Sequence, residues 1–204
     1  MSEYRDRSYS VVVAMRGNVH PVAYAAHTAM ANPANAKRVD GAVIYGKEIG
    51  YARCRLFETA IATGAAYALC LDDDVLPPRD IVARLLDGFE AAPSDTAAVS
   101  ALYCTKDAEN LPIILGDPAR GADDHTWRRA PAVPGLVMVN AIPLGAALVS
   151  LAAIKKVAPP VCVMTDDESE DVNLSRKLTA LGFKLYVDTR IRCGHLDVTT
   201  GTIY

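Results

Sequence analysis

The fold is decided by Leu71-Asp72-Asp73-Asp74-Val75-Leu76-Pro77-Pro78, where three carboxylates end an apolar run and two prolines prevent its continuation. The run before them, residues 67–71, has the length and apolar character of a short buried strand. Because proline suits the first turn of a helix, the next helix is expected to begin near Arg79. Side chains alternate along a strand, so we expect Asp72 and Asp74 to point the same way and to form a hard-oxygen site for a divalent cation.

Strand-like and helix-like segments alternate on both sides of this stretch. Strands are expected at residues 10–15, 41–45, 67–71, 96–103, 136–140, 144–150, 184–187 and 190–193, and helices at 21–30, 51–63, 79–89, 151–157 and 165–182. Gly64 is a suitable residue just past the end of the second helix. Residues 106–134, rich in Pro, Gly, Asp and Arg, are expected to form a hairpin or long loops at the ligand edge. The alternation predicts one α/β domain over residues 1–204, with a mostly parallel sheet and helices on both faces.

Composition narrows the classes of function. The chain has 204 residues, 51% hydrophobic and 22% charged, which is typical of a globular protein. A net charge of −3 provides no overall basic field for nucleic acid or an anionic membrane. Five cysteines without a CxxC pair or zinc spacing indicate free thiols in a reducing compartment. With no leader-like segment and no apolar stretch long enough to span a bilayer, we expect a soluble, cytoplasmic protein.

A second acidic cluster begins at Thr165. Thr165 and Glu168 match a capping box, with Thr165 as the N-cap and Glu168 at the third helical position. Asp171 lies one turn before Leu174, on the apolar stripe of the expected helix. A carboxylate in that place either caps buried groups or faces a cleft, and the second placement suits a general base.

His195 follows an expected strand in Cys193-Gly194-His195-Leu196-Asp197. A neutral imidazole is a good ligand for a divalent metal, although a single histidine also serves as a hydrogen-bonded structural residue.

In this order, the segments resemble GT-A-type glycosyltransferases, particularly the inverting family-2 enzymes. Ala52-Arg53-Cys54-Arg55 is similar to the Ala-Arg-Asn helix of that family, with Cys54 in place of the usual asparagine, and the Asp-rich stretch is similar to its Asp-x-Asp strand end. Glu170-Asp171-Val172 resembles the Glu-Asp helix, and Gly194-His195 resembles the terminal metal-binding histidine. The resemblance covers residues 10–201, nearly the whole chain.

The resemblance implies a metal-dependent transfer of a sugar from a nucleotide diphosphate, a UDP- or GDP-sugar, to an acceptor hydroxyl. It implies that Asp74 and His195 hold Mn²⁺ or Mg²⁺ on the diphosphate. The metal ion then acts as a Lewis acid for the leaving group. Asp171 then deprotonates the acceptor, and a single displacement inverts the anomeric carbon. The remaining residues of the expected donor site are Asp72, Asp73, Arg53, Met15, Arg16 and Glu170.

The roles of two further features of the sequence stay open. Arg53 is either a nucleotide contact or a solvated helix residue. Trp127 with Arg128 and Arg129 is either a sugar platform or core packing. The acceptor class is also open, because a glycan, a lipid, a protein or a hydroxymethylated DNA base each offers a hydroxyl. A DNA acceptor requires a local basic groove that the net charge does not favour.

The main alternative is a HAD-type phosphatase, with Asp72 as the nucleophile, Asp74 as the acid/base and bound Mg²⁺. That family places its Asp motif on the first strand, whereas at least two strand–helix units precede it here. A sugar-1-phosphate nucleotidyltransferase requires a glycine-rich basic loop, which Met15-Arg16-Gly17-Asn18 matches poorly. A binding module that retains an acidic loop is disfavoured because all three motifs occur in order.

Overall fold

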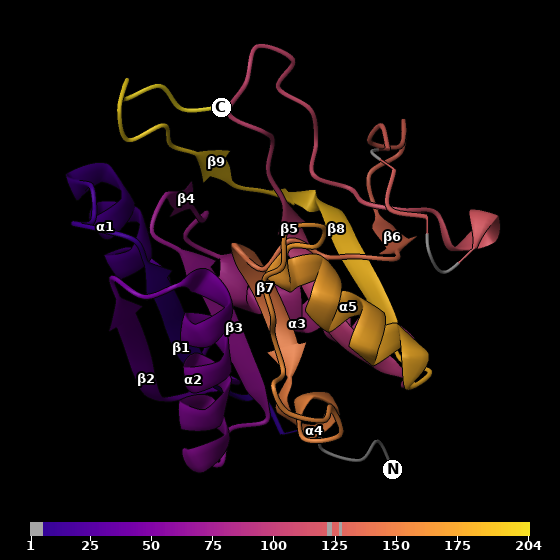
Figure 1. Cartoon of the computed structure of the whole chain (residues 1–204). Coiled ribbons are helices and arrows are strands. Elements are labelled where there is room, and N and C mark those ends of the chain that lie inside the picture. The colour runs from indigo at the N-terminus through magenta and orange to yellow at the C-terminus, as the bar shows by residue number, and fades with distance from the viewer. Residues whose placement is uncertain (1–5, 122–123, 127) are drawn as a thin grey trace.

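The computed structural model describes residues 6–121, 124–126 and 128–204. The strands are β1 (Ser8–Met15), β2 (Lys37–Tyr45), β3 (Tyr67–Asp72), β4 (Val75–Leu76), β5 (Thr96–Leu102), β6 (Leu136–Val139), β7 (Ala146–Ser150), β8 (Lys184–Arg192) and β9 (Gly194–His195). The helices are α1 (Pro21–Thr28), α2 (Ile49–Ala62), α3 (Ile81–Ala91), α4 (Leu151–Ile154) and α5 (Glu170–Ala180), with a 3₁₀ turn η1 (Pro118–Arg120). Figure 1 shows how these elements are arranged around the central sheet.

Seven strands form one sheet in the order β2-β1-β3-β7-β5-β8-β6. β2, β1, β3, β5 and β8 run in one direction, and β7 and β6 run against them. The mostly parallel sheet predicted from the alternating pattern is therefore confirmed. β4 and β9 form a separate antiparallel ribbon that pairs Val75 with His195.

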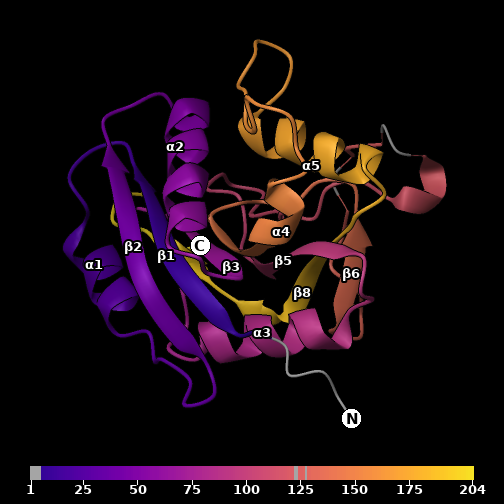
Figure 2. The ribbon, with the colours of Figure 1, turned by 90° about the horizontal axis from the view of Figure 1, so that it is seen from below.

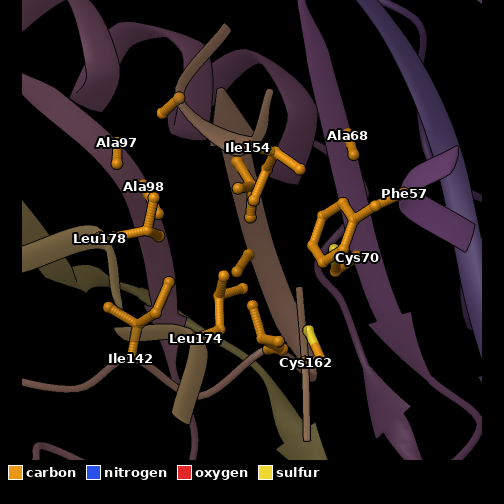
Figure 3. Close-up of a cluster of buried hydrophobic side chains, with 14 of the residues drawn as sticks. Phe57, Ala68, Cys70, Ala97, Ala98, Ile142, Ile154, Cys162, Leu174 and Leu178 are labelled. Carbon is orange, nitrogen blue, oxygen red and sulfur yellow. The ribbon is translucent and has the colours of Figure 1, made fainter. Parts of the chain in front are cut away.

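Helices cover both faces of the sheet, with α2, α4 and α5 on one face and α3 on the other (Figure 2). The side chains of β3 alternate between the two cores, as expected for a strand buried on both faces. Ala68 and Cys70 belong to the core under α2 and α5, which also holds Phe57 (Figure 3). Leu69 and Leu71 belong to the core under α3. Asp72 follows the alternation of Ala68 and Cys70, which directs it toward α2 and α5.

Several predicted boundaries were wrong. The last helix begins at Glu170, and its N-cap is Ser169 rather than Thr165. Thr165 instead closes a separate turn, in which the Glu168 amide donates to the Thr165 Oγ1 at 3.0 Å. The helix expected near Arg79 begins at Ile81. The two strands expected near the carboxyl end are the single strand β8, whereas Gly64 has a φ of 74° just past α2, as predicted.

The described residues between β5 and β6 form loops around η1, with isolated bridges at Cys104–Pro112 and Leu115–Ala141. This confirms the prediction of long loops. Arg128 donates to the carbonyl oxygens of Gly116 and Met138, at 3.2 and 3.0 Å, so its guanidinium braces these loops. Trp127 lies outside the described residues. None of the helices in the described part of the chain has the length and apolar character needed to cross a membrane.

Candidate active site

The predicted residues gather at the carboxyl ends of the parallel strands, where ligands of open α/β sheets bind. Arg16 follows β1, and Asp72 ends β3 and is followed by Asp73 and Asp74. Lys106 lies in the loop after β5, and β9 places His195 opposite Val75.

Asp74 is the most enclosed of the three aspartates, with 2% of the residue exposed. Its Oδ2 accepts a hydrogen bond from the Lys106 Nζ at 2.6 Å and another from the Arg16 Nη2. Burial alone would raise the pKa of Asp74, but His195, Lys106 and Arg16 together hold it well below its usual range. Asp74 is therefore an ionised acceptor at neutral pH.

His195 is oriented by the chain around it. Its Nδ1 lies 2.6 Å from the Cys104 carbonyl oxygen, which only accepts hydrogen bonds, so Nδ1 carries the hydrogen. Nε2 then holds a lone pair in the neutral ring and lies 3.6 Å from the Asp74 Oδ1. The Tyr103 ring packs edge-on against the imidazole, with centroids 5.1 Å apart.

The pair of Asp74 Oδ1 and His195 Nε2 fits a divalent cation. Oδ1 is buried and has no hydrogen-bond partner, whereas buried polar atoms in proteins are normally hydrogen-bonded. Within the described ranges, no group of three or more His, Cys, Asp or Glu side chains is assembled for a metal. An ion here would take two protein ligands, and a diphosphate and waters would complete its coordination, as is usual for Mg²⁺ in phosphate sites.

Arg53 lies beneath Asp72 rather than on the surface. Its Nη2 donates to the Asp72 Oδ1 at 2.5 Å, and the residue is 1% exposed. Burial would lower the pKa of Arg53, but the carboxylates of Asp72, Asp171 and Glu170 raise it above its ordinary value. The alternative of a solvated helix residue is wrong, because Arg53 contacts Asp72 from the protein interior.

Asp171 lies on the inward face of the first turn of α5, as predicted. Its Oδ2 accepts from the Leu144 amide at 3.1 Å, while Oδ1 is shielded from solvent and has no partner. Burial raises the pKa of Asp171 well above its ordinary value, and Glu170 adds to this effect, whereas Arg53 opposes it. A carboxyl group with a raised pKa and an unused oxygen has the properties of a general base.

Asp73 and Asp74 depart from the predicted geometry. β3 ends at Asp72 and the next two residues form a turn, so strand alternation does not align Asp72 with Asp74. The two carboxylates contact different partners, so the predicted Asp72–Asp74 pair is not formed, and Asp74 instead faces His195. The Asp73 Oδ2 accepts from the Arg16 backbone amide at 2.9 Å and thereby fixes the loop after β1.

Two further expected donor-site residues lie at the ends of secondary-structure elements. Met15 is the half-buried last residue of β1, and Glu170 is 8% exposed at the start of α5 beside Asp171.

Sequence reasoning missed Tyr103, Lys106 and Gly145. The Gly145 amide donates to the Tyr103 Oη at 3.1 Å. A Cβ on Gly145 would lie 2.4 Å from that Oη and 2.8 Å from the Asp72 Oδ2, so only glycine fits. Burial raises the pKa of Tyr103 well above its ordinary value, and its phenol stays protonated. Their position is the only signal in the sequence: Tyr103 and Lys106 follow β5, and Gly145 precedes β7.

The chain matches no family description and no curated protein. Its structure is similar to that of A197 from STIV, with a TM-score of 0.67 and 14% identity over 94% of this chain and 86% of that chain. It is also similar to GalNAc-T7 solved with UDP, GalNAc and Mn²⁺, with a TM-score of 0.60 and 14% identity. That match covers 93% of this chain but 44% of GalNAc-T7, so this chain spans less than half of that one. The likenesses confirm the predicted α/β architecture of the GT-A type.

Proposed function

We propose that this protein is a glycosyltransferase that moves a sugar from a UDP- or GDP-sugar to an acceptor hydroxyl, with Mn²⁺ or Mg²⁺ and with inversion. The observation that carries the proposal is the pairing of the unpartnered Asp74 Oδ1 with the His195 Nε2. A second carboxylate, Asp171, interacts with Asp72 and has a raised pKa. GalNAc-T7, which shares the fold, was solved with UDP, GalNAc and Mn²⁺, which supports the same ligand class here.

Asp74 and His195 would hold the divalent ion against the two phosphates of the donor. The ion would supply positive charge for the departing nucleoside diphosphate. The Cys104 carbonyl keeps the Nε2 of His195 free for this task, and Lys106 and Arg16 keep Asp74 ionised.

Asp171 would take the proton of the acceptor hydroxyl onto its Oδ1, while the hydroxyl oxygen attacks the anomeric carbon. The Leu144 amide, which donates to Oδ2, fixes the orientation of the carboxylate. Arg53, which pairs with Asp72, limits how far the pKa of Asp171 rises, because it stabilises the ionised form. One displacement by one nucleophile gives inversion at the sugar carbon.

The acceptor is expected to approach through the loops that follow β5, next to the site. A glycan, a lipid, a protein or a hydroxymethylated DNA base each supplies the hydroxyl that this chemistry needs. A screen of these four classes with the donor identified below is the direct way to assign it.

The phosphatase alternative fits the geometry less well. It requires Asp74 to give a proton to the leaving group, but the cations around Asp74 hold its pKa well below the usual range. A general acid needs a pKa near the working pH. The proposed nucleophile, Asp72, is also committed to an ion pair with the buried Arg53.

The test is thermal unfolding with UDP, GDP, CDP, ADP and TDP, each with and without Mn²⁺, because ligands that bind the native state raise the melting temperature. We expect one nucleoside diphosphate to give a metal-dependent shift that Asp74→Asn abolishes. Asp171→Asn should keep the shift and lose sugar transfer. A shift with Mg²⁺ and a phosphate mimic, but with no nucleotide, would favour the phosphatase.

A further inference from the structure

Two cations share one oxygen of Asp74. The Lys106 Nζ and the Arg16 Nη2 both donate to Oδ2, from the loop after β5 and the loop after β1. The Lys106 ammonium also lies 3.4 Å from the Leu196 carbonyl oxygen. Asp74 is thus neutralised by protein cations on Oδ2, while its Oδ1 remains directed toward His195.

This arrangement conflicts with a divalent ion on the same carboxylate. Two positive charges at such a short distance repel each other, and the repulsion is strong where the surroundings are partly desolvated. The ammonium of Lys106 and a metal ion therefore compete for Asp74 unless negative charge arrives with the metal. A diphosphate supplies that charge, because its oxygens accept hydrogen bonds from ammonium groups and also bind divalent ions.

Lys106 is the more accessible member of its ion pair with Asp74. Its side chain is 27% exposed and extends from a loop, whereas Asp74 is 3% exposed and fixed in a turn. An ammonium group has three hydrogen donors, and two of them account for Asp74 and Leu196. Arg16 is more exposed, at 70%, and its backbone is already tied to Asp73.

We infer that Lys106 is a diphosphate-binding residue, which is held on Asp74 in the free protein and donates to a phosphate oxygen when the nucleotide and metal bind together. This inference rests on the proposed function and adds to it a specific ligand for the leaving group. Metal and nucleotide then bind cooperatively, because each removes the charge that opposes the other. The sequence shows Lys106 only as one residue of a polar loop, without a motif.

The test is calorimetric titration of the wild-type protein and Lys106→Met with inorganic pyrophosphate, UDP and GDP, in EDTA and in Mn²⁺. In Mn²⁺ we expect Lys106→Met to bind pyrophosphate about 10- to 100-fold more weakly, the usual effect of losing one charged hydrogen bond. Mn²⁺ alone, followed by its electron spin resonance signal, should bind Lys106→Met more tightly than the wild type, because the competing cation is gone.

Two variants serve as controls. Lys106→Arg keeps the charge and should retain most of the pyrophosphate affinity. Lys184→Met removes an exposed ammonium that pairs with Asp95 at the opposite end of β8, and it should match the wild type. If Lys106→Met does not fold, Lys106→Gln replaces it in every titration, with folding checked by thermal unfolding.

The outcomes separate this inference from the proposed function. If Lys106→Met binds pyrophosphate, the nucleotides and Mn²⁺ as the wild type does, while Asp74→Asn loses nucleotide binding, Lys106 is a structural counter-ion and the inference is overturned. In that case the proposed function still stands. If the wild-type protein binds no nucleotide and no pyrophosphate in any condition, the proposed function fails and the inference fails with it.

Discussion

Arg53→Met tests the buried charge network under the site. The substitution keeps most of the side-chain volume and removes a cation that opposes the effect of the Asp72 and Glu170 carboxylates on Asp171. Arg53 itself is 1% exposed and paired with Asp72. We therefore expect a stability loss much larger than that of a surface substitution.

The size of the loss follows from this burial. Removing one partner of a buried ion pair costs about 3–5 kcal/mol, because the remaining charge is left without compensation. In a chain of this size each kcal/mol lowers the melting temperature by about 2–4 °C, so the expected drop is about 6–20 °C. Because the loss arises from carboxylates left without a cation, it should shrink as the pH falls and these groups take up protons.

Urea and thermal unfolding at pH 7 and pH 4 measure the effect. Arg55→Met is the matched control, because Arg55 lies on the same helix and pairs with Glu58 on the surface. The double variant Arg53→Met/Asp171→Asn should recover part of the loss, since it removes one of the stranded carboxylates. An Arg53→Met protein as stable as Arg55→Met, or a double variant no more stable than Arg53→Met, would refute the role of Arg53 as a buried counter-ion.

Three further expectations concern separate parts of the chain. Gly145→Ala should lower stability by about 1–3 kcal/mol and weaken nucleotide binding, because its Cβ would meet the Tyr103 Oη at 2.4 Å; unchanged urea unfolding would contradict this. Hydrogen bonds from Cys162 lower the pKa of Cys54 to about 6, so the rate of its reaction with iodoacetamide should rise with pH around a midpoint near that value. Cys162→Ala should move this midpoint upward, as measured by mass spectrometry over a range of pH. The native pKa of Asp74 is depressed, so the stability that its carboxylate adds relative to Asp74→Asn should be fully present above about pH 4 and be lost at lower pH. A stability difference that stays constant in urea titrations down to pH 3 would count against this expectation.

Local patterns were sufficient to predict most of the fold. The apolar run of β3, the glycine after α2 and the loop-rich segment before β6 each reflect short-range rules of burial and backbone freedom. The antiparallel direction of β7 was not predicted, because strand direction depends on which neighbours the strand pairs with. The start of α5 was missed because Thr165 and Glu168 satisfy the same capping pattern in an isolated turn.

The site was predictable only where a motif carries it. Asp74, His195 and Asp171 were chosen from ordered motifs, and the structure brings the first two together. Lys106 and Tyr103 reach the site from the loop and strand end of β5, through contacts 32 and 42 residues apart in sequence. Such contacts depend on the order of strands in the sheet, which the sequence pattern does not specify.

The turn at Asp73 and Asp74 has a consequence for the division of chemical roles. It directs Asp72 toward Arg53 and the region of Asp171, and it directs Asp74 toward Lys106 and His195. In the first environment burial, with Glu170 and Asp72 adding to it, raises the pKa of Asp171, whereas in the second the cations overcome burial and lower the pKa of Asp74. Carboxyl groups whose environments move their pKa values in opposite directions are suited to opposite tasks. The proposed function therefore assigns proton acceptance to the α5 side and the charge of the departing diphosphate to the β9 side.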